Sequence, residues 1–180
     1  MPRKLLLSLS LVAVAVAAFV ATSHALAPKP AIRADLPARG LPVVAVSDSV
    51  RASIASLIGV DAAQQFGISS DSYTQIRQLA TTSAGAIYVV PGTNGLCVAL
   101  LPAVSCGRPG HNADASVAVF VPDPSGNFLV GGGVTAASAG HVSLHARNGA
   151  TADATAVDGG FTLSASAGIK PGQRFEVVVQ

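Results

Sequence analysis

The chain has little charge, few aromatic side chains and no tryptophan. Charged residues make up 11% of its 180 residues and aromatic residues 4%. The formal net charge of +2 comes from Arg3 and Lys4, because the nine other basic side chains are matched by nine acidic ones. A chain without a basic cluster lacks the electrostatic footprint that binds a phosphate backbone. We therefore expect no nucleic-acid partner.

The hydrophobic residues are numerous but small. They make up 50% of the chain, which is too many for wholesale disorder. About 155 residues remain if a leader of 25 is removed, enough for one domain of ordinary size. Much of the hydrophobicity comes from alanine and valine, and a core of small side chains buries less area per residue. We expect modest stability, helped by a covalent cross-link.

The first 25 residues have the layout of a secretory signal peptide. Arg3 and Lys4 precede a 17-residue apolar run, Leu5–Ala21, and Ser23 and Ala25 provide small residues for cleavage after Ala25. The alternative is an uncleaved anchor, since 17 apolar residues lie at the lower limit for spanning a bilayer. Either way the rest of the chain is predicted to be extracytoplasmic, secreted or associated with the cell envelope. A membrane is an expected partner only if this segment is uncleaved.

Composition divides the remainder into a connector and a β-rich domain. Residues 26–46 are rich in alanine and proline and predict the connector. Residues 47–180 predict the domain, with a division into two lobes near 107–114 as an option, because turn residues are dense there.

One short helix is predicted at the start of the domain. Ser47 or Asp48 can cap it, and Gly59 stands where a helix would end. Residues 61–66 could add another turn, whereas residues 73–82 fit a helix or a strand and favour a strand. The apolar residues at helical spacing are Val50, Ile54, Leu57 and Ile58.

Many short β-type runs follow, separated by turn signals. Alternating apolar residues, as in the run 115–121, predict strands with one buried face. Asn148-Gly149 is a strong hairpin signal between the run 141–147 and the run 151–157. The predicted fold class is mainly β, an antiparallel sandwich or small barrel with one short N-terminal helix. The other predicted strands are 86–90, 96–101, 128–130, 161–166 and 175–179.

The only two cysteines, Cys97 and Cys106, predict a disulfide in an oxidising compartment. Turn chemistry at 91–95 makes a hairpin, and Leu101-Pro102 interrupts its second run, so the bond would tie the second strand to a third. The alternative is a metal site with His111 as a third ligand, but the spacing lacks a paired-cysteine knuckle and a fourth ligand. We predict no metal and no cofactor.

Two parts of the sequence resemble known families. The strand 142–146, the Asn148-Gly149 turn and the segment 158–163 resemble carboxypeptidase regulatory-like domains, which are transthyretin-like β-sandwich modules. This resemblance implies a structural or binding role and transfers no catalytic residue. The segment 88–97, together with Ser105-Cys106-Gly107, is similar to uncharacterised bacterial secreted proteins, which implies export and a disulfide.

Three features that suggest active chemistry have simpler explanations. His141 and His145 have the spacing of a helical zinc site, but the residues around them alternate as in a strand, so we expect surface histidines. Residues 131–136, with Asp153 about 20 residues further on, nominally fit a dinucleotide-binding loop, but no helix pattern follows them. No serine lies in a nucleophile elbow. We assign no catalytic residue.

Two functions remain as hypotheses. The one we favour is an exported, non-enzymatic module with a structural or binding role and an extracytoplasmic protein or glycan as its partner. The alternative is a secreted hydrolase whose catalytic site the sequence does not reveal. A deep pocket that gathers a serine, a histidine and an aspartate would favour the hydrolase, whereas a shallow polar face would favour the binding module.

Overall fold

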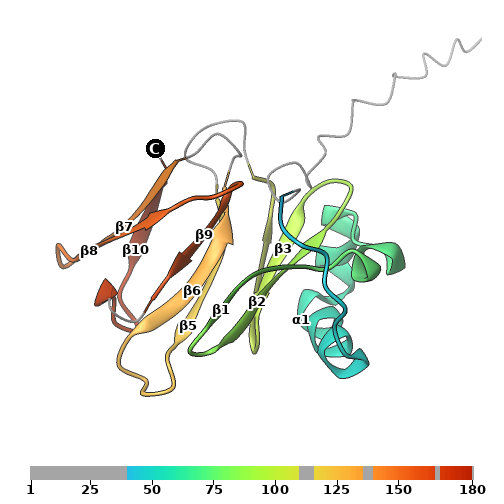
Figure 1. Cartoon of the computed structure of the whole chain (residues 1–180), viewed down its shortest axis with the longest axis horizontal. Coiled ribbons are helices and arrows are strands. Elements are labelled where there is room, and N and C mark those ends of the chain that lie inside the picture. The colour runs from blue at the N-terminus through green and yellow to red at the C-terminus, as the bar shows by residue number, and fades with distance from the viewer. Residues whose placement is uncertain (1–39, 110–115, 136–139, 165–166, 180) are drawn as a thin grey trace, which may run out of the picture.

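The computed structural model describes residues 40–109, 116–135, 140–164 and 167–179. Within these residues one α-helix precedes ten strands, which form three antiparallel sheets (Figure 1). The predicted mainly β class, with antiparallel sheets and a helix near the N-terminal end, is confirmed. The predicted signal peptide lies outside the described residues, as does most of the boundary proposed between two lobes.

The helix α1 (Asp48–Phe66) continues past Gly59 and includes the additional turn at residues 61–66 that the sequence left as an option. Ser47 caps its start, since the Ser47 side chain accepts a hydrogen bond from the helix backbone. Gly59 has a φ of 69°, which kinks the helix without ending it. The chain returns to helix after the kink because Ala62, Ala63 and Phe66 pack against the neighbouring sheet.

The helix-side sheet is a four-stranded meander covered on both faces. Ile54 and Ile58 of α1 pack on one face, against Val90 and Cys97. The central sheet, described below, packs on the other face. As a result, all five residues of the third strand are buried. The strands, hydrogen-bonded in chain order, are β1 (Arg77–Thr82), β2 (Gly85–Pro91), β3 (Leu96–Leu100) and β4 (Ala103–Gly107).

The predicted strand at residues 73–82 starts later than expected. Ser70–Thr74 forms a 3₁₀ turn, and the strand β1 begins only at Arg77. Ser69 and Ser72 hold this turn through reciprocal hydrogen bonds between side chain and backbone, a local alternative to extended pairing.

The central sheet is the middle layer and contains the glycine run. A side-chain carbon at Gly131 or Gly133 would collide with the backbone of the strand on one side, and one at Gly132 with the strand on the other. These glycines therefore allow close approach of the neighbouring strands. The strands, in hydrogen-bonded order, are β5 (Val117–Pro122), β6 (Leu129–Val134) and β9 (Gly160–Leu163).

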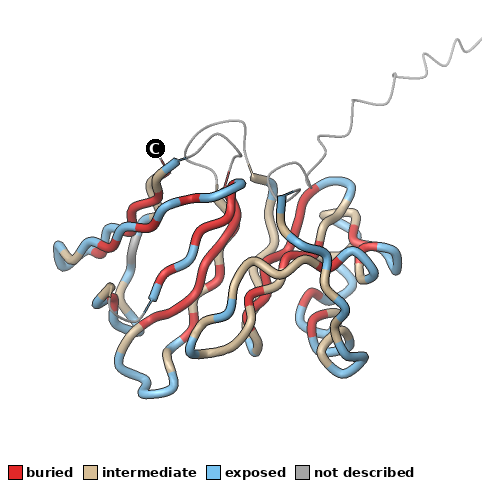
Figure 2. Tube along the Cα trace, in the orientation of Figure 1, coloured by how far each residue is buried: buried red, intermediate tan, exposed pale blue. Residues whose placement is uncertain are grey.

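The outer sheet has one buried face. Val142, Leu144 and Ala154 pack inward against Phe161 and Leu163 of the central sheet. Its other face points to solvent, so buried and exposed residues alternate along β8 (Figure 2). The strands, in hydrogen-bonded order, are β10 (Phe175–Val179), β7 (His141–Ala146) and β8 (Thr151–Thr155).

The β7–β8 hairpin turns where Asn148-Gly149 predicted it, but the register is fixed by the core. Val142 lies opposite Ala154, and Leu144 lies opposite Ala152, so the apolar residues of both strands share the inner face. This register needs an odd number of residues in the loop, and the backbone bonds of Ala146 leave residues 147–149 to form it. Gly149 supplies the left-handed conformation, with a φ of 86°.

Candidate functional site

The open face of the outer sheet is the candidate site, because it places both described histidines on one strand beside hydroxyl and carboxylate groups. Every second residue of β7, β8 and β10 lies on the face opposite the apolar core, and Ser143 is the buried member of this set. We define the open face by the residues that alternate with the buried ones: His141, Ser143 and His145 of β7, Thr151, Asp153 and Thr155 of β8, and Glu176 and Val178 of β10.

A hydroxyl, a carboxylate and an imidazole meet on this face. Ser143 and Asp153 lie directly opposite each other on β7 and β8, and Ser143 Oγ donates to Asp153 Oδ1 at 2.7 Å. His141 Nε2 lies 3.3 Å from the same carboxylate oxygen. Ser143 is only 6% exposed, whereas the side chains of His141 and Asp153 are 45% and 62% exposed. The carboxylate is therefore held by its neighbours but remains open to a ligand.

The network stabilises the ionised form of Asp153. The hydrogen bond from the Ser143 hydroxyl lowers the pKa of the Asp153 carboxyl, and the hydrogen bond and charge of His141 add to the effect. His145 contributes a smaller lowering of the same pKa through its charge. The face thus presents a fixed carboxylate at neutral pH, flanked by imidazole and hydroxyl groups.

The order of these three groups differs from that of a hydrolase triad. In a triad, the serine hydroxyl bonds to the histidine, and the aspartate orients that histidine from its far side. Here the carboxylate is the central group, and both Ser143 and His141 contact the same oxygen atom of Asp153. The Ser143 hydroxyl donates to the Asp153 carboxylate, whereas in a triad it would donate to the histidine. The arrangement can accept hydrogen bonds from a ligand but does not prepare a nucleophile.

Two depressions border the open face. One, of about 380 Å³, lies between β8 and β9 and is lined by Asp153 together with threonine and serine side chains. The second, of about 650 Å³, lies where β7 and β10 meet their adjoining turns, and both His145 and Glu176 line it. Both have the size range of small-ligand sites, and both are lined largely by polar side chains.

The two cysteines form the predicted disulfide. Cys97 of β3 and Cys106 of β4 lie opposite each other in register and are bonded, so the bond joins the second strand of the hairpin to the third. This bond uses both sulfur atoms, so the alternative metal site with His111 is not formed. His111 itself lies outside the described residues.

The two histidines lie on the strand predicted for them. His141 and His145 both belong to β7 and point away from its apolar residues. In register, His145 lies opposite Glu176 and His141 opposite Thr155. Among the residues that the structure describes, no three histidine, cysteine, aspartate or glutamate side chains are grouped to hold a metal ion.

The glycine run does not form a phosphate-binding loop. Gly131, Gly132 and Gly133 are buried inside β6, where both neighbouring strands pair with them. Asp153 lies on β8 in a different sheet. The described glycines of the nominal dinucleotide motif therefore lie within a paired strand, and not in the strand-to-helix turn that such a site needs.

The pairing of Ser143 with Asp153 was not predicted from the sequence. The signal that could have revealed it is the alternation of apolar residues on both sides of the Asn148-Gly149 turn. Once Leu144 is placed opposite Ala152, Ser143 must lie opposite Asp153.

Comparison with known proteins identifies no relative of this chain. No protein-family model, curated protein or solved structure matches the chain. In the described part of the chain, no helix combines the length and the apolar composition needed to cross a membrane.

Proposed function

We propose that this chain is an exported, non-enzymatic binding module whose open face recognises a glycan of the cell envelope. The observation that carries this proposal is the fixed carboxylate of Asp153, oriented by Ser143 and His141 on an open, polar sheet. Sugar hydroxyls are bound by such fixed acceptors and donors, and Thr151 and Thr155 add hydroxyl groups beside them.

Three features support export. The first 25 residues have the layout of a signal peptide, and the chain resembles secreted bacterial proteins around its two cysteines. The Cys97–Cys106 bond is in keeping with an oxidising compartment. The resemblance of the C-terminal strands to carboxypeptidase regulatory-like domains agrees with a binding role, since those modules are usually non-catalytic.

Export is tested by expressing the full chain, and a chain lacking residues 1–25, in a secreting bacterial host. We expect the full chain to be found outside the cytoplasm, with residues 1–25 removed by cleavage after Ala25. Both cysteines should be protected from alkylation. The shortened chain should stay in the cytoplasm. Recovery of the full chain in the cytoplasm with its leader intact would contradict the proposal.

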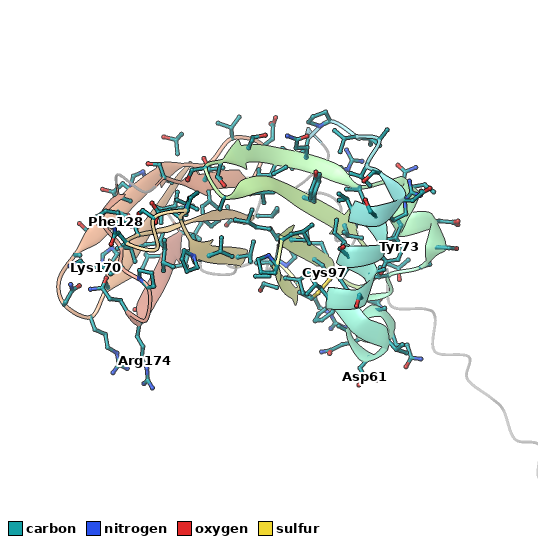
Figure 3. All side chains as sticks on the ribbon, turned by 90° about the horizontal axis from the view of Figure 1, so that it is seen from below. Asp61, Tyr73, Cys97, Phe128, Lys170 and Arg174 are labelled. Atoms are coloured by element: carbon teal, nitrogen blue, oxygen red, sulfur yellow. A yellow bond between two sulfur atoms is a disulfide. The ribbon has the colours of Figure 1, made fainter. Side chains whose placement is uncertain are left out.

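Glycan binding is tested by sedimentation of the purified protein with insoluble envelope polysaccharide. Asp153→Asn should weaken binding by about tenfold, because it removes a charged acceptor worth about 1.5–3 kcal/mol. Asp61→Asn is the matched control, since Asp61 is an exposed aspartate on α1, far from the open face (Figure 3). Equal losses of binding for both variants would overturn the glycan assignment. So would a protein that sediments with envelope protein but not with the polysaccharide.

A further inference from the structure

Two arginines face each other at the end of the outer sheet. The pairing of β7 with β10 ends at Ala146 and Phe175, and the Arg147 N–H then donates to the Arg174 carbonyl at 3.1 Å. The ladder therefore continues by one pair, and both exposed side chains leave the sheet on the side of His145 and Glu176. Like charges directly opposite on antiparallel strands destabilise a sheet.

The other described arginines have partners inside the protein. Arg51 pairs with Asp48, and Arg77 and Arg108 donate to backbone carbonyls. Within the described residues, the ion pairs are Arg51–Asp48 and His141–Asp153, so no described carboxylate forms an ion pair with Arg147 or Arg174. The fold thus places two arginines without an ion pair to a described carboxylate at opposite positions of neighbouring strands.

These two groups line the 650 Å³ depression. Its other lining residues are His145, Ala146, Gln173 and Glu176. The Gln173 Oε1 accepts a hydrogen bond from the Lys170 backbone at 2.8 Å, which leaves its amide nitrogen available as a donor. Lys170 and Arg174 project from the same end of the molecule in Figure 3. Guanidinium, imidazole and amide groups therefore surround one cavity.

We propose that this depression binds the carboxylate of an acidic sugar, held between Arg147 and Arg174. Guanidinium groups bind carboxylates through two parallel hydrogen bonds, and an anion between them would remove the repulsion of the facing arginines. Two guanidinium groups and the Glu176 carboxylate leave the cavity with a net charge of +1, which matches a carboxylate better than a dianionic phosphate. Glu176 and Gln173 are placed to bond the sugar hydroxyls.

This inference rests on the proposed function only for the source of the acidic sugar. The binding itself is measured on the purified protein, by calorimetry with a trimer of galacturonic acid. We expect a dissociation constant near or below about 1 mM, that is, at least about 4 kcal/mol of binding free energy. The fully methyl-esterified trimer should bind at least tenfold more weakly, and inorganic phosphate should bind more weakly than the acid. Higher salt should weaken the binding of the acid.

Variants then locate the site. Arg147→Gln and Arg174→Gln should each weaken binding of the acid by about tenfold, the effect expected for loss of a charge-assisted hydrogen bond. Lys170→Gln is the matched control, because it removes the same charge at the same end without removing a lining residue. Glu176→Gln should strengthen binding of phosphate relative to the acid.

A thermal measurement separates binding from folding. Without ligand, Arg147→Gln should leave the melting temperature unchanged or raise it, since it relieves the repulsion between the arginines. With the trimer present, the same variant should show a smaller ligand-induced rise than the parent protein.

Equal binding of the acid and its ester, an equal loss in Lys170→Gln, or tighter binding of phosphate would overturn this inference. So would a lower melting temperature of Arg147→Gln without ligand. Retention on envelope polysaccharide through Asp153 would be untouched by any of these results, so the two proposals fail separately.

Discussion

The helix-side sheet and the outer sheet are both antiparallel, but only the outer sheet keeps one face in solvent. In the helix-side sheet, α1 and the central sheet cover the two faces, so even the middle strand β3 carries only apolar residues and Cys97. In the outer sheet, the central sheet covers one face, and β8 reads exposed, buried, exposed along its length. The comparison teaches that the outer sheet can present polar side chains to a ligand because no layer covers its second face.

The two sheets are also held together differently. The helix-side sheet has a covalent bond between neighbouring strands, and its polar side chains gather on the edge strand β1. The outer sheet depends on a thin inner face of valine, leucine and alanine packed against Phe161, and on the polar network of Ser143 and Asp153. Substitutions should therefore affect the two regions through different physical causes.

The largest expected effect is on the contact between the outer and central sheets. Phe161 is only 1% exposed, and Phe161→Ala should lower the free energy of unfolding by about 3–5 kcal/mol, because it leaves a cavity beneath the outer sheet. Val157→Ala is the control, since Val157 is 65% exposed and should change the unfolding free energy by less than about 0.5 kcal/mol. Denaturant unfolding measures both, and a loss below 1 kcal/mol for Phe161→Ala would contradict the packing described.

Removal of the disulfide should have the next largest effect. Replacing both Cys97 and Cys106 by alanine should cost about 2–3 kcal/mol, because the unfolded chain regains the freedom of a short closed loop. Thermal unfolding of the double variant, compared with the oxidised parent protein, checks this value. An unchanged melting temperature would show that the bond does not stabilise the helix-side sheet.

A substitution at Thr135 should stabilise the protein. Thr135 follows β6, is fully buried, and its Oγ1 makes no hydrogen bond to a described residue. Thr135→Val removes the unpaired hydroxyl at nearly constant volume and should raise the free energy of unfolding by about 1 kcal/mol. Thr155→Val, on the open face, should have little effect. A destabilised Thr135→Val variant would mean that the hydroxyl has a partner in solution.

The smallest expected effect is a pH dependence from the open face. Hydrogen bonds lower the pKa of Asp153 in the folded protein, with the Ser143 hydroxyl as the largest cause. A lowered folded pKa gives stability that is present above the unfolded pKa and is lost as the pH falls through the folded value. Asp153→Asn should therefore flatten the fall in melting temperature between about pH 5 and pH 2.

Asp123 provides the comparison for this titration. Its pKa is lowered chiefly by the backbone N–H of Phe128, in the turn between β5 and β6, and not by the open face. Asp123→Asn should flatten the same acid limb but leave glycan binding intact. A glycan-binding loss in Asp123→Asn equal to that of Asp153→Asn would argue against a site on the open face.

The sequence predicted the fold class, the disulfide and the strand placement of His141 and His145, because each follows from local patterns. Alternation marks a half-buried strand, and two cysteines allow one pairing. Local patterns left open whether α1 ends at Gly59 or gains a turn at residues 61–66, because the packing of Ala62, Ala63 and Phe66 against the sheet decides it.

The contents of the open face were harder to predict because they depend on register between strands. Ser143 and Asp153 are ten residues apart, and only the pairing of β7 with β8 brings them together. Arg147 and Arg174 are further apart still, so no basic cluster appears in the sequence although one forms where β7 and β10 end. The pairing of β7 with β10 thus brings two positive side chains together, although the numbers of basic and acidic residues in the chain nearly balance.

The most direct test of a binding surface on the outer sheet is chemical-shift mapping of the purified protein with soluble glycan fragments from the envelope of the producing cell. We expect the shifted backbone amides to belong to β7, β8, β10 and their adjoining turns, with α1 and β1–β4 unchanged. Shifts centred on α1 or the helix-side sheet, or no shift at saturating fragment, would contradict the account.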